Sequence, residues 1–360
     1  MAERSVCYLG AFDLEHTRNR VIRLGLEARG WKVSVAPLPV GLNLRQTLPL
    51  LWRTMRREAR HCDALIVAEH NQFLAPLAVG LGRLLRKPVL VDYIVGVYES
   101  RVVDNNAAKK NNWRHQAYRA LDAWNMGVAN GVFTDTNRHK AALQTLIGPP
   151  ARRLAVVPVG VAPEWLNAEP PPDKNHDEPL LVQFYGNYNP FHGTEVILRA
   201  LSWLNTDDRF RFEMIGRGPK YQDALKRAHL LGIKRLTFID PPERAALIQM
   251  VSRADICLGV FARRTKTDYV VPHRIMECLA LGKPVITAES AAVAEYFTPG
   301  EDLITVPPSN PGDLARMIRR LADEPDLRER LALTGAATVR RQYTPEQVVA
   351  PLIALLERVI

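Results

Sequence analysis

Hydrophobic positions along the 360-residue chain form short apolar runs that alternate with longer stretches of helical spacing. Runs such as SVCYLG (5–10), DALIVAE (63–69) and PVLVDYI (88–94) predict strands, whereas residues 16–30 and 112–130 predict helices. Strands and helices that alternate at this pitch are typical of parallel β-α-β units, with helices on both faces of a sheet. We therefore expect an α/β fold.

The alternation is interrupted once and then begins again. Residues 166–179 are rich in proline and charge and have no hydrophobic period, which predicts a linker. The strand LLVQFYG (180–186) starts the second series. We therefore predict two doubly wound, Rossmann-like domains, 1–165 and 180–340. Such folds bind ligands at the carboxyl ends of their strands, so we expect the domains to face a central cleft.

Charge adds one feature, because the excess of basic residues lies entirely in the first domain. Residues 1–165 contain 23 of the 48 Lys and Arg residues and only 13 of the 38 Asp and Glu residues. Residues 166–360 therefore contain 25 basic and 25 acidic residues, with no excess of either. Part of the excess falls in residues 51–61, where arginines follow helical spacing beside Leu51 and Trp52. This basic amphipathic helix either contacts anionic lipid or an anionic substrate, or is a solvated face without a partner.

Composition places the chain among globular proteins, with 47% hydrophobic and 24% charged residues. No apolar run approaches the roughly 20 residues of a membrane span, and the acidic start MAERSVCYLG leads directly into a strand, unlike a signal peptide. The cysteines lack C-x-x-C spacing and are predicted to be reduced core residues: Cys7, Cys62, Cys257 and Cys278. We therefore expect a cytoplasmic protein, either free or peripheral at the inner face of the membrane.

A single glutamate stands inside the apolar segment VVPHRIMECLALGKPVI (270–286). Ile275 and Leu279 have helical spacing and Gly282 ends the pattern, so Glu277 is predicted to lie on a short helix ahead of a strand. Two interpretations fit this position. Glu277 is either a solvated surface residue or a carboxylate that binds hydroxyl groups of a ligand.

The turn Gly216-Arg217-Gly218 follows a strand, but Tyr221 stands where a third glycine would complete a dinucleotide fingerprint. A tight turn and a contact to phosphate or base are both consistent with it. The chain contains neither G-x-x-x-x-G-K-[ST] nor G-x-S-x-G, and its nine histidines lack metal-ligand spacing. These patterns disfavour a dinucleotide oxidoreductase, a P-loop enzyme and a metal enzyme, and we expect no metal site.

Residues 184–201 contain a more informative loop. A strand ends at Gly186, the loop passes through His192, and Gly193 begins a helix with Glu195 in its first turn. The amides of a helix N-terminus beside a histidine suit a diphosphate. The alternative is a loop in which His192 forms its hydrogen bonds with other groups of the protein and binds no ligand.

These segments together resemble the family 4 glycosyltransferases of the GT-B fold. FYGNYNPFHGTEVILRAL (184–201) resembles the glycine loop and helix that open the donor domain, and residues 212–225 and 235–261 resemble its next strands and turns. VPHRIMECLALGKPVITAES (271–290) resembles the segment that binds the sugar nucleotide, and VVPVGVAPEWL (156–166) resembles the end of the acceptor domain. The likeness covers nearly the whole chain.

The resemblance implies that residues 1–165 bind the acceptor, that residues 180–340 bind a nucleoside-diphosphate sugar, and that a final helix, 341–360, packs back on the first domain. It implies a retaining sugar transfer without metal or further cofactor, in which positive groups and helix amides stabilise the leaving diphosphate. Glu277 would then bind the two ribose hydroxyls, because a carboxylate accepts two hydrogen bonds from a vicinal diol. The implied donor-binding residues are Gly186, Asn187, His192, Gly193, Gly216, Arg217, Lys266, His273, Arg274, Ile275 and Glu277.

Several positions depart from the family pattern. Tyr269 stands where many members carry the first glutamate of a Glu-x7-Glu pair. Pro272-His273-Arg274 resembles an arginine version of the Pro-x-Lys pattern, and Asn187 and His192 replace the basic residues of the glycine loop. We therefore expect His192 and Arg274 to hold the diphosphate as catalytic groups. The residues in reserve are Arg217, Arg263, Arg264 and Lys266.

The acceptor half offers candidates at the carboxyl ends of its predicted strands, where ligands bind in such sheets. Asp92 and Tyr93 end one strand, with Glu99 soon after, and Glu69 and His70 end another. Asp92 and Glu99 are the acidic groups that we take as catalytic candidates. For each of these residues the competing interpretation is a helix cap or a turn.

We therefore predict a glycosyltransferase that moves a sugar from a nucleoside-diphosphate sugar to a glycan, lipid-linked or cell-envelope acceptor. One alternative is a catalytically inactive sugar-nucleotide-binding GT-B protein, which would explain Tyr269 and Asn187. Another is a GT-B epimerase or phosphorylase. A binding module for nucleic acid or membrane would use the basic helix, but it would leave the second domain without a role, and we expect no nucleic-acid partner.

Overall fold

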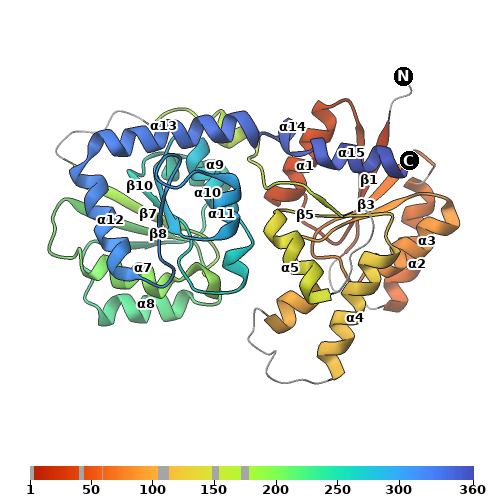
Figure 1. Cartoon of the computed structure of the whole chain (residues 1–360), viewed down its shortest axis with the longest axis horizontal. Helices are drawn as coiled ribbons and strands as arrows, with labels where there is room; N and C mark the ends of the chain where they lie inside the picture. Colours follow the sequence, from red (N-terminus) through yellow and green to blue (C-terminus); the bar gives the residue numbers. More distant parts are fainter. Residues whose placement is uncertain (1–3, 40–43, 59, 104–112, 148–153, 172–177) are drawn as a thin grey trace. The chain divides into compact units, whose positions relative to one another are not determined.

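A computed structural model of the chain consists of two compact units. Unit 1 comprises Met1–Gly160 and Tyr343–Ile360, and unit 2 comprises Val161–Gln342. Figure 1 shows both, coloured along the sequence. The structure describes residues 4–39, 44–58, 60–103, 113–147, 154–171 and 178–360.

Unit 1 contains a parallel six-stranded sheet in the order β2-β1-β3-β4-β5-β6. The central strands are fully buried apolar runs, as expected of a sheet covered on both faces. The strand order reverses between β1 and β3, which makes their carboxyl ends the expected ligand-binding edge. The strands are β1 (Ser5–Gly10), β2 (Lys32–Pro37), β3 (Ala64–Val67), β4 (Val89–Asp92), β5 (Gly131–Thr134) and β6 (Leu154–Val156).

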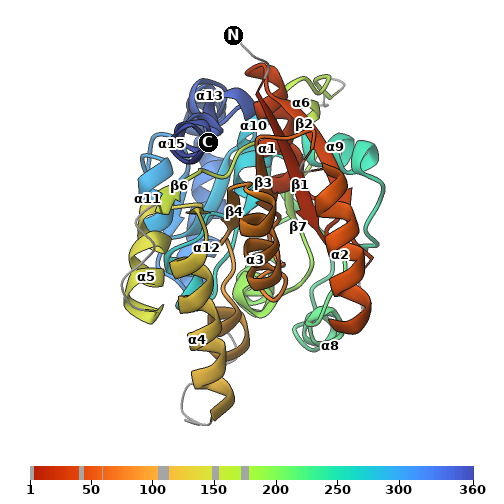
Figure 2. The same ribbon diagram turned by 90° about the vertical axis from the view of Figure 1, so that its right-hand side faces the viewer.

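Helices cover both faces of this sheet. Right-handed crossovers place α1 (Thr17–Ala28) on one face and the helices of the other connections on the opposite face, as Figures 1 and 2 show. Helices α14 (Pro345–Val348) and α15 (Ala350–Val359) return to unit 1, where α14 packs against α1 and α15 against β5 and β6. The opposite layer consists of α2 (Leu44–Glu58), α3 (Ala75–Leu85), α4 (Trp113–Val128) and α5 (Asn137–Ile147), and the short η1 (Glu99–Val103) precedes α4.

Unit 2 contains a second parallel sheet, in the order β12-β11-β10-β7-β8-β9. This is the Rossmann order, and its switch point lies between β7 and β10. The strands are β7 (Leu180–Tyr185), β8 (Phe210–Ile215), β9 (Leu236–Ile239), β10 (Ile256–Leu258), β11 (Val285–Ala288) and β12 (Ile304–Val306). The helices are α6 (Pro163–Leu166), η3 (Pro190–His192), α7 (Thr194–Ser202), α8 (Tyr221–Leu230), α9 (Arg244–Ser252), η4 (Lys266–Asp268), α10 (His273–Ala280), α11 (Ala291–Tyr296), α12 (Pro311–Asp323) and α13 (Pro325–Gln342).

The boundaries differ from those expected in two places. Unit 2 begins at Val161, because α6 packs against α10 and its Trp165 ring stacks on Tyr185, with the ring centroids 6.1 Å apart. The final helix is divided into α14 and α15, since Pro351 cannot donate the backbone hydrogen bond that a continuous helix requires. Most of the linker expected at 166–179 lies outside the described residues, which resume at residue 178.

Candidate functional site

The carboxyl end of β7 in unit 2 is shaped by glycines that let other groups approach the backbone. Gly186 has φ 150°, and a Cβ atom there would overlap the Arg274 guanidinium, with Cζ only 2.9 Å away. Gly193 ends η3 at φ 67° and leads into α7. The Val196 amide already donates to the Gly193 carbonyl (2.9 Å), whereas the amides of Thr194 and Glu195 begin the helix, where no preceding turn supplies an acceptor. This end of the sheet therefore offers both a cation and backbone donors.

Arg274 is a buried cation whose polar contacts are all neutral. Its side chain is 7% exposed and donates to the Gly259 carbonyl (3.3 Å) and to His192 (3.1 Å to Nε2). Its Cζ atom lies 4.3 Å from the centroid of the Phe184 ring. No carboxylate forms an ion pair with Arg274 among the described residues, and burial lowers the pKa of Arg274 to about 10. A buried charge without a counter-ion is costly, so this site favours an anionic ligand.

His192 is held as a neutral imidazole beside this cation. Burial, and next the positive charge of Arg274, keep the pKa of His192 far below its usual value. A neutral imidazole can accept from Arg274 at one nitrogen while donating from the other. His192 and Arg274, both expected to hold a diphosphate, therefore lie in contact although they are 82 positions apart in sequence.

Glu277 lies one turn after Arg274 on α10 and is 6% exposed. It is thus not the solvated surface residue that one interpretation of the sequence expected. Its Oε2 accepts a 2.6 Å hydrogen bond from the Tyr185 hydroxyl at the end of β7. Burial, and then the charge of Glu277, raise the pKa of Tyr185 well above its usual value, so Tyr185 remains a donor. The bond fixes the Glu277 carboxylate at the carboxyl edge of the sheet.

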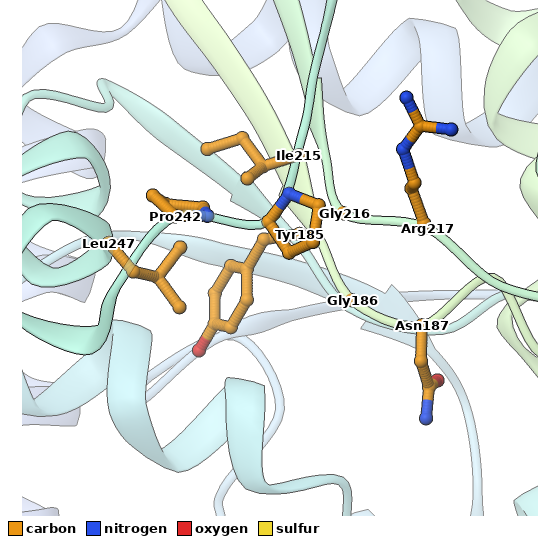
Figure 3. A pocket seen from close by; sticks show the side chains of 9 residues that line it. Tyr185, Gly186, Asn187, Ile215, Gly216, Arg217, Pro242 and Leu247 are labelled. Carbon is orange, nitrogen blue, oxygen red and sulfur yellow. The ribbon is translucent and has the colours of Figure 1, made fainter.

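A pocket of about 170 Å³ is lined by Tyr185, whose hydroxyl binds this carboxylate. Figure 3 shows the Tyr185 ring and the apolar side chains around it facing one another, while Arg217 and Asn187 extend away. Its backbone wall is the paired turn of Gly186 and Gly216, which approach so closely that a Cβ on Gly216 would overlap the Gly186 carbonyl. The apolar wall consists of Tyr185, Ile215, Pro241, Pro242 and Leu247. A flat apolar pocket with backbone polar groups at its rim suits an aromatic base.

Two of the other predicted donor-binding residues, Asn187 and Arg217, line this pocket together with Gly186 and Gly216, but the hydrogen bonds of their side chains go to other partners. Arg217 is exposed and forms an ion pair with Asp240 (2.6 Å), and Asn187 is exposed and accepts from Asn189 (3.0 Å). The remaining three precede or begin α10: Lys266 is half-buried in η4, His273 is half-buried, and Ile275 is fully buried.

In unit 1, Asp92 is bound to an arginine that sequence analysis did not single out. Arg18 of α1 donates to both carboxylate oxygens (2.7 and 3.1 Å), and both side chains are buried. Burial raises the pKa of Asp92 to about 6, even though Arg18 favours its charged form. The pair ties α1 to β4, a structural task that explains Asp92 without a catalytic role.

Glu99 is likewise part of a buried cluster. His139 contacts Glu99 through Nε2 (3.1 Å) and Asp135 through Nδ1, and burial lowers its pKa less than the two carboxylates raise it, to about 10. Tyr93 donates to the buried Asp122. These contacts explain Glu99 and Tyr93 as links between β4, β5 and the helices that follow them.

The switch point of unit 1 instead brings together Glu69, His70 and His16. Glu69 follows β3, is 3% exposed, and accepts from Asn19 (3.2 Å) and His16. Chiefly through this bond Glu69 raises the pKa of His16, and the two imidazole rings lie 6.4 Å apart. His16 precedes α1 in a polar loop, where no motif distinguishes it from a helix cap. Only the strand order brings it to Glu69.

Within 4–39, 44–58, 60–103, 113–147, 154–171 and 178–360, no three His, Cys, Asp or Glu side chains gather in a way that could hold a metal ion. None of the helices in these ranges is both long and apolar enough to span a membrane.

Comparison with known proteins relates the chain to glycosyltransferases. Residues 195–354, less than half of the chain, match the glycosyl transferase-like family. The alpha-D-kanosaminyltransferase of Streptomyces kanamyceticus is 26% identical over 170 residues, which are 47% of this chain and 43% of that protein. The chain spans less than half the length of the first curated relatives that it matches.

Solved structures share the architecture over almost the whole chain. Sucrose-phosphate synthase from Thermosynechococcus elongatus superposes with a TM-score of 0.73 at 17% identity, and the match covers 99% of each chain. Anabaena HepE in complex with UDP and glucose superposes with a TM-score of 0.68 at 15% identity, again over 99% of each chain. The fold is therefore GT-B, two Rossmann-like parallel-sheet domains, and the fold class expected from the sequence is confirmed. Together with the sequence relatives, this supports a glycosyltransferase of GT-B fold.

Proposed function

We propose that the protein is a glycosyltransferase that moves a sugar from a nucleoside-diphosphate sugar to an acceptor hydroxyl. Unit 2 binds the donor and unit 1 the acceptor, the anomeric configuration is retained, and neither a metal nor a further cofactor takes part. The bond between the anomeric carbon and the diphosphate oxygen breaks, and a bond to the acceptor oxygen forms. The acceptor proton leaves with the released nucleoside diphosphate.

The observation that carries this proposal is the environment of Arg274. The Arg274 guanidinium is 7% exposed and stacks on Phe184. No carboxylate pairs with it in the described part of the chain, so an anionic ligand would supply its counter-ion. It lies against Gly186, beside His192, at the switch point where Rossmann-like sheets bind ligands. A diphosphate would accept from Arg274, from neutral His192 and from the first amides of α7. These donors would stabilise the charge that grows on the diphosphate as the sugar leaves.

Glu277 and the 170 Å³ pocket support a nucleotide rather than another anion. The Tyr185 ring lines the pocket while its hydroxyl donates to Glu277, so one residue links an apolar slot to a buried carboxylate. A base in the slot would bring its ribose diol toward Glu277, which is the role that the resemblance implies. The two HepE structures with UDP, at TM-scores of 0.68 and 0.71, are consistent with this class of donor.

For the acceptor we propose the switch point of unit 1. Glu69 is a buried carboxylate at the carboxyl end of β3, flanked by the half-exposed imidazoles of His16 and His70. This arrangement offers an acceptor for a sugar hydroxyl together with imidazole donors. Asp92 and Glu99, each held by a buried basic partner, position the surrounding strands instead.

Calorimetric titration of UDP, GDP, ADP and dTDP without added metal tests the donor site. We expect one nucleotide to bind the wild type and to bind Glu277→Ala and Arg274→Gln roughly 10- to 100-fold more weakly, because a hydrogen bond to a charged group contributes about 1.5–3 kcal/mol. Glu213→Gln is the matched control, since Glu213 is a half-buried carboxylate of the same sheet that binds Gln183 (3.0 Å). Failure of all four nucleotides to bind, or equal weakening in Glu213→Gln, would reject the donor site.

A second candidate function is donor binding without turnover. Tyr269, 3% exposed, stands where many family members carry a glutamate, and Asn187 replaces a basic residue of the glycine loop. An inactive protein would bind the nucleotide as above but release no nucleoside diphosphate from a matching sugar nucleotide. Measured release that depends on Arg274 would exclude this candidate.

A further inference from the structure

Helix α4 of unit 1 buries two polar side chains, Asp122 and Asn125, beside the apolar Met126. Asp122 is fully buried and accepts from the Tyr93 hydroxyl, and Asn125 is fully buried and donates to the Gln72 carbonyl (2.8 Å). An ordinary amphipathic helix buries its apolar stripe and exposes its polar one. The buried polar side chains of α4, Asp122 and Asn125, thus find their hydrogen-bond partners inside unit 1.

One stripe of the solvent-exposed side of α4 is apolar. Trp113 and Trp124 are 75% and 53% exposed, and their spacing of 11 residues is three helical turns, so they project from the same side about 16 Å apart. Ala117 and Ala120 are exposed between them on the same stripe. The Arg114 guanidinium lies 5.6 Å from the centroid of the Trp113 ring. Exposed aromatic side chains that line up in this way mark an interaction surface.

The neighbouring helices extend this surface. Helix α4 packs against α3 and α5, and α3 packs against α2, so the four helices form one layer (Figure 2). Leu48 on α2 and Leu84 on α3 are 43% and 73% exposed, and Phe73, just before α3, is 58% exposed. Among the described residues of unit 1, the large hydrophobic side chains that are exposed all belong to this layer or to the loop that enters it, except Ile360 at the chain end.

Charge on the α2–α5 layer has a single sign. The only acidic residues in its four helices are Asp122, which is buried, and Glu58, which is half-buried and pairs with Arg57. Helices α1 and α15 on the opposite face mix both signs. The basic residues of the layer are Arg45, Arg53, Arg56, Arg57, Arg83, Arg114, Arg119, Arg138 and Lys140. The basic helix expected at residues 51–61 is therefore one part of a larger basic surface.

We propose that the α2–α5 layer docks on an anionic lipid surface, with Trp113 and Trp124 as its anchors. Tryptophan suits the boundary between headgroups and acyl chains, because its ring is apolar and its N–H donates to water or headgroup oxygens. The arginines around the two rings complement lipid phosphates, and each basic residue near such a surface adds attraction. An anionic lipid bilayer has an apolar interior beneath negatively charged headgroups. It can therefore accommodate the tryptophan rings and attract the basic residues of the α2–α5 layer. The proposal goes beyond sugar transfer and does not depend on the donor site.

Flotation with lipid vesicles tests this proposal on the full chain. At low salt the wild type is expected to float with vesicles of phosphatidylglycerol and phosphatidylcholine, and not with phosphatidylcholine alone. Trp113→Ala with Trp124→Ala should lower the partition coefficient at least tenfold, and Arg114→Gln with Arg119→Gln about fivefold per residue. Brominated acyl chains should quench tryptophan fluorescence of the wild type and quench the double tryptophan variant much less.

Matched controls separate docking from general surface effects. Trp203→Ala in unit 2 removes a tryptophan of the same 53% exposure as Trp124, and Lys226→Gln with Arg330→Gln removes two exposed basic residues of unit 2. Both controls should bind vesicles as the wild type does. The proposal is overturned if the wild type ignores anionic vesicles, or if the controls lose binding equally. It is also overturned if the tryptophan variant changes only the mass of the protein in solution, which would assign the layer to a second copy of the chain.

Discussion

Two arginines of this protein are equally inaccessible to water but lie in opposite electrostatic surroundings. Arg18 is 1% exposed and meets Asp92 in a two-point ion pair. Arg274 is 7% exposed, and its partners are a carbonyl, an imidazole and an aromatic ring. The charge of Arg18 is compensated by a direct ion pair, whereas no carboxylate contacts Arg274 among the described residues and the charge of Glu277 acts on it only from a distance. This difference in counter-ion, rather than burial, underlies our proposal of a structural role for Arg18 and a ligand-binding role for Arg274.

Replacing each arginine by methionine should separate these roles. Arg18→Met leaves Asp92 buried without its partner and should lower the free energy of unfolding of unit 1 by about 3–5 kcal/mol. Arg274→Met removes an uncompensated charge and keeps the stacking on Phe184, so the melting temperature of unit 2 should stay equal or rise. The same variant should lose nucleoside-diphosphate binding. Calorimetric melting with and without nucleotide measures both effects, and a strongly destabilised Arg274→Met would contradict the assignment.

At the scale of elements, a buried charge cluster joins segments that lie far apart in sequence. His139 on α5 contacts Asp135, just after β5, and Glu99 at the start of η1. Burial opposes a charged imidazole, but the two carboxylates raise the pKa of His139 to about 10. His139 therefore stays a cation between about pH 6.5, where a free histidine loses its charge, and about pH 10.

This cluster predicts a pH-dependent stability of unit 1. Because the pKa of His139 is raised on folding, its contribution is fully present below the unfolded pKa near 6.5 and is lost as the pH rises through about 10. The free energy of unfolding of unit 1 should thus fall over this window more steeply in the wild type than in His139→Gln. Urea titrations at pH 6, 8 and 10 measure the slopes. His229→Gln on the surface of α8 should behave as the wild type, and parallel slopes for wild type and His139→Gln would refute the cluster's role.

The sequence predicted the individual elements of the fold better than the contacts between them. Apolar period and turn residues are local, so they predicted the alternating strands and helices and the helix that carries Arg274 and Glu277. The partners of these residues are not local: Tyr185 and His192 reach α10 from the end of β7, and the contacts depend on strand order. Likeness to the family motifs is what singled out His192, Arg274 and Glu277, and their role in donor binding stays a prediction. His16 belonged to no motif and was missed.

At the scale of the whole molecule, the chain completes unit 1 only after it has built unit 2. It leaves unit 1 at Gly160, forms the second sheet, and returns at Tyr343 with α14 and α15. Gly25 of α1 allows the close packing of α14, since a Cβ there would overlap the Pro345 carbonyl. Synthesis of the first 160 residues therefore leaves unit 1 without α14, which packs against α1, and without α15, which packs against β5 and β6.

The returning helix should stabilise unit 1 and not the nucleotide site. Leu356 on α15 is 0% exposed, so Leu356→Ala should lower the free energy of unfolding of unit 1 by about 2–5 kcal/mol. Leu333→Ala on α13 removes a leucine that is 66% exposed and should change stability by less than about 0.5 kcal/mol. In differential scanning calorimetry, nucleotide should still raise the melting transition of unit 2 in Leu356→Ala, because ligand binding stabilises only the unit that it binds. Loss of nucleotide binding in this variant would mean that the donor site depends on unit 1 as well.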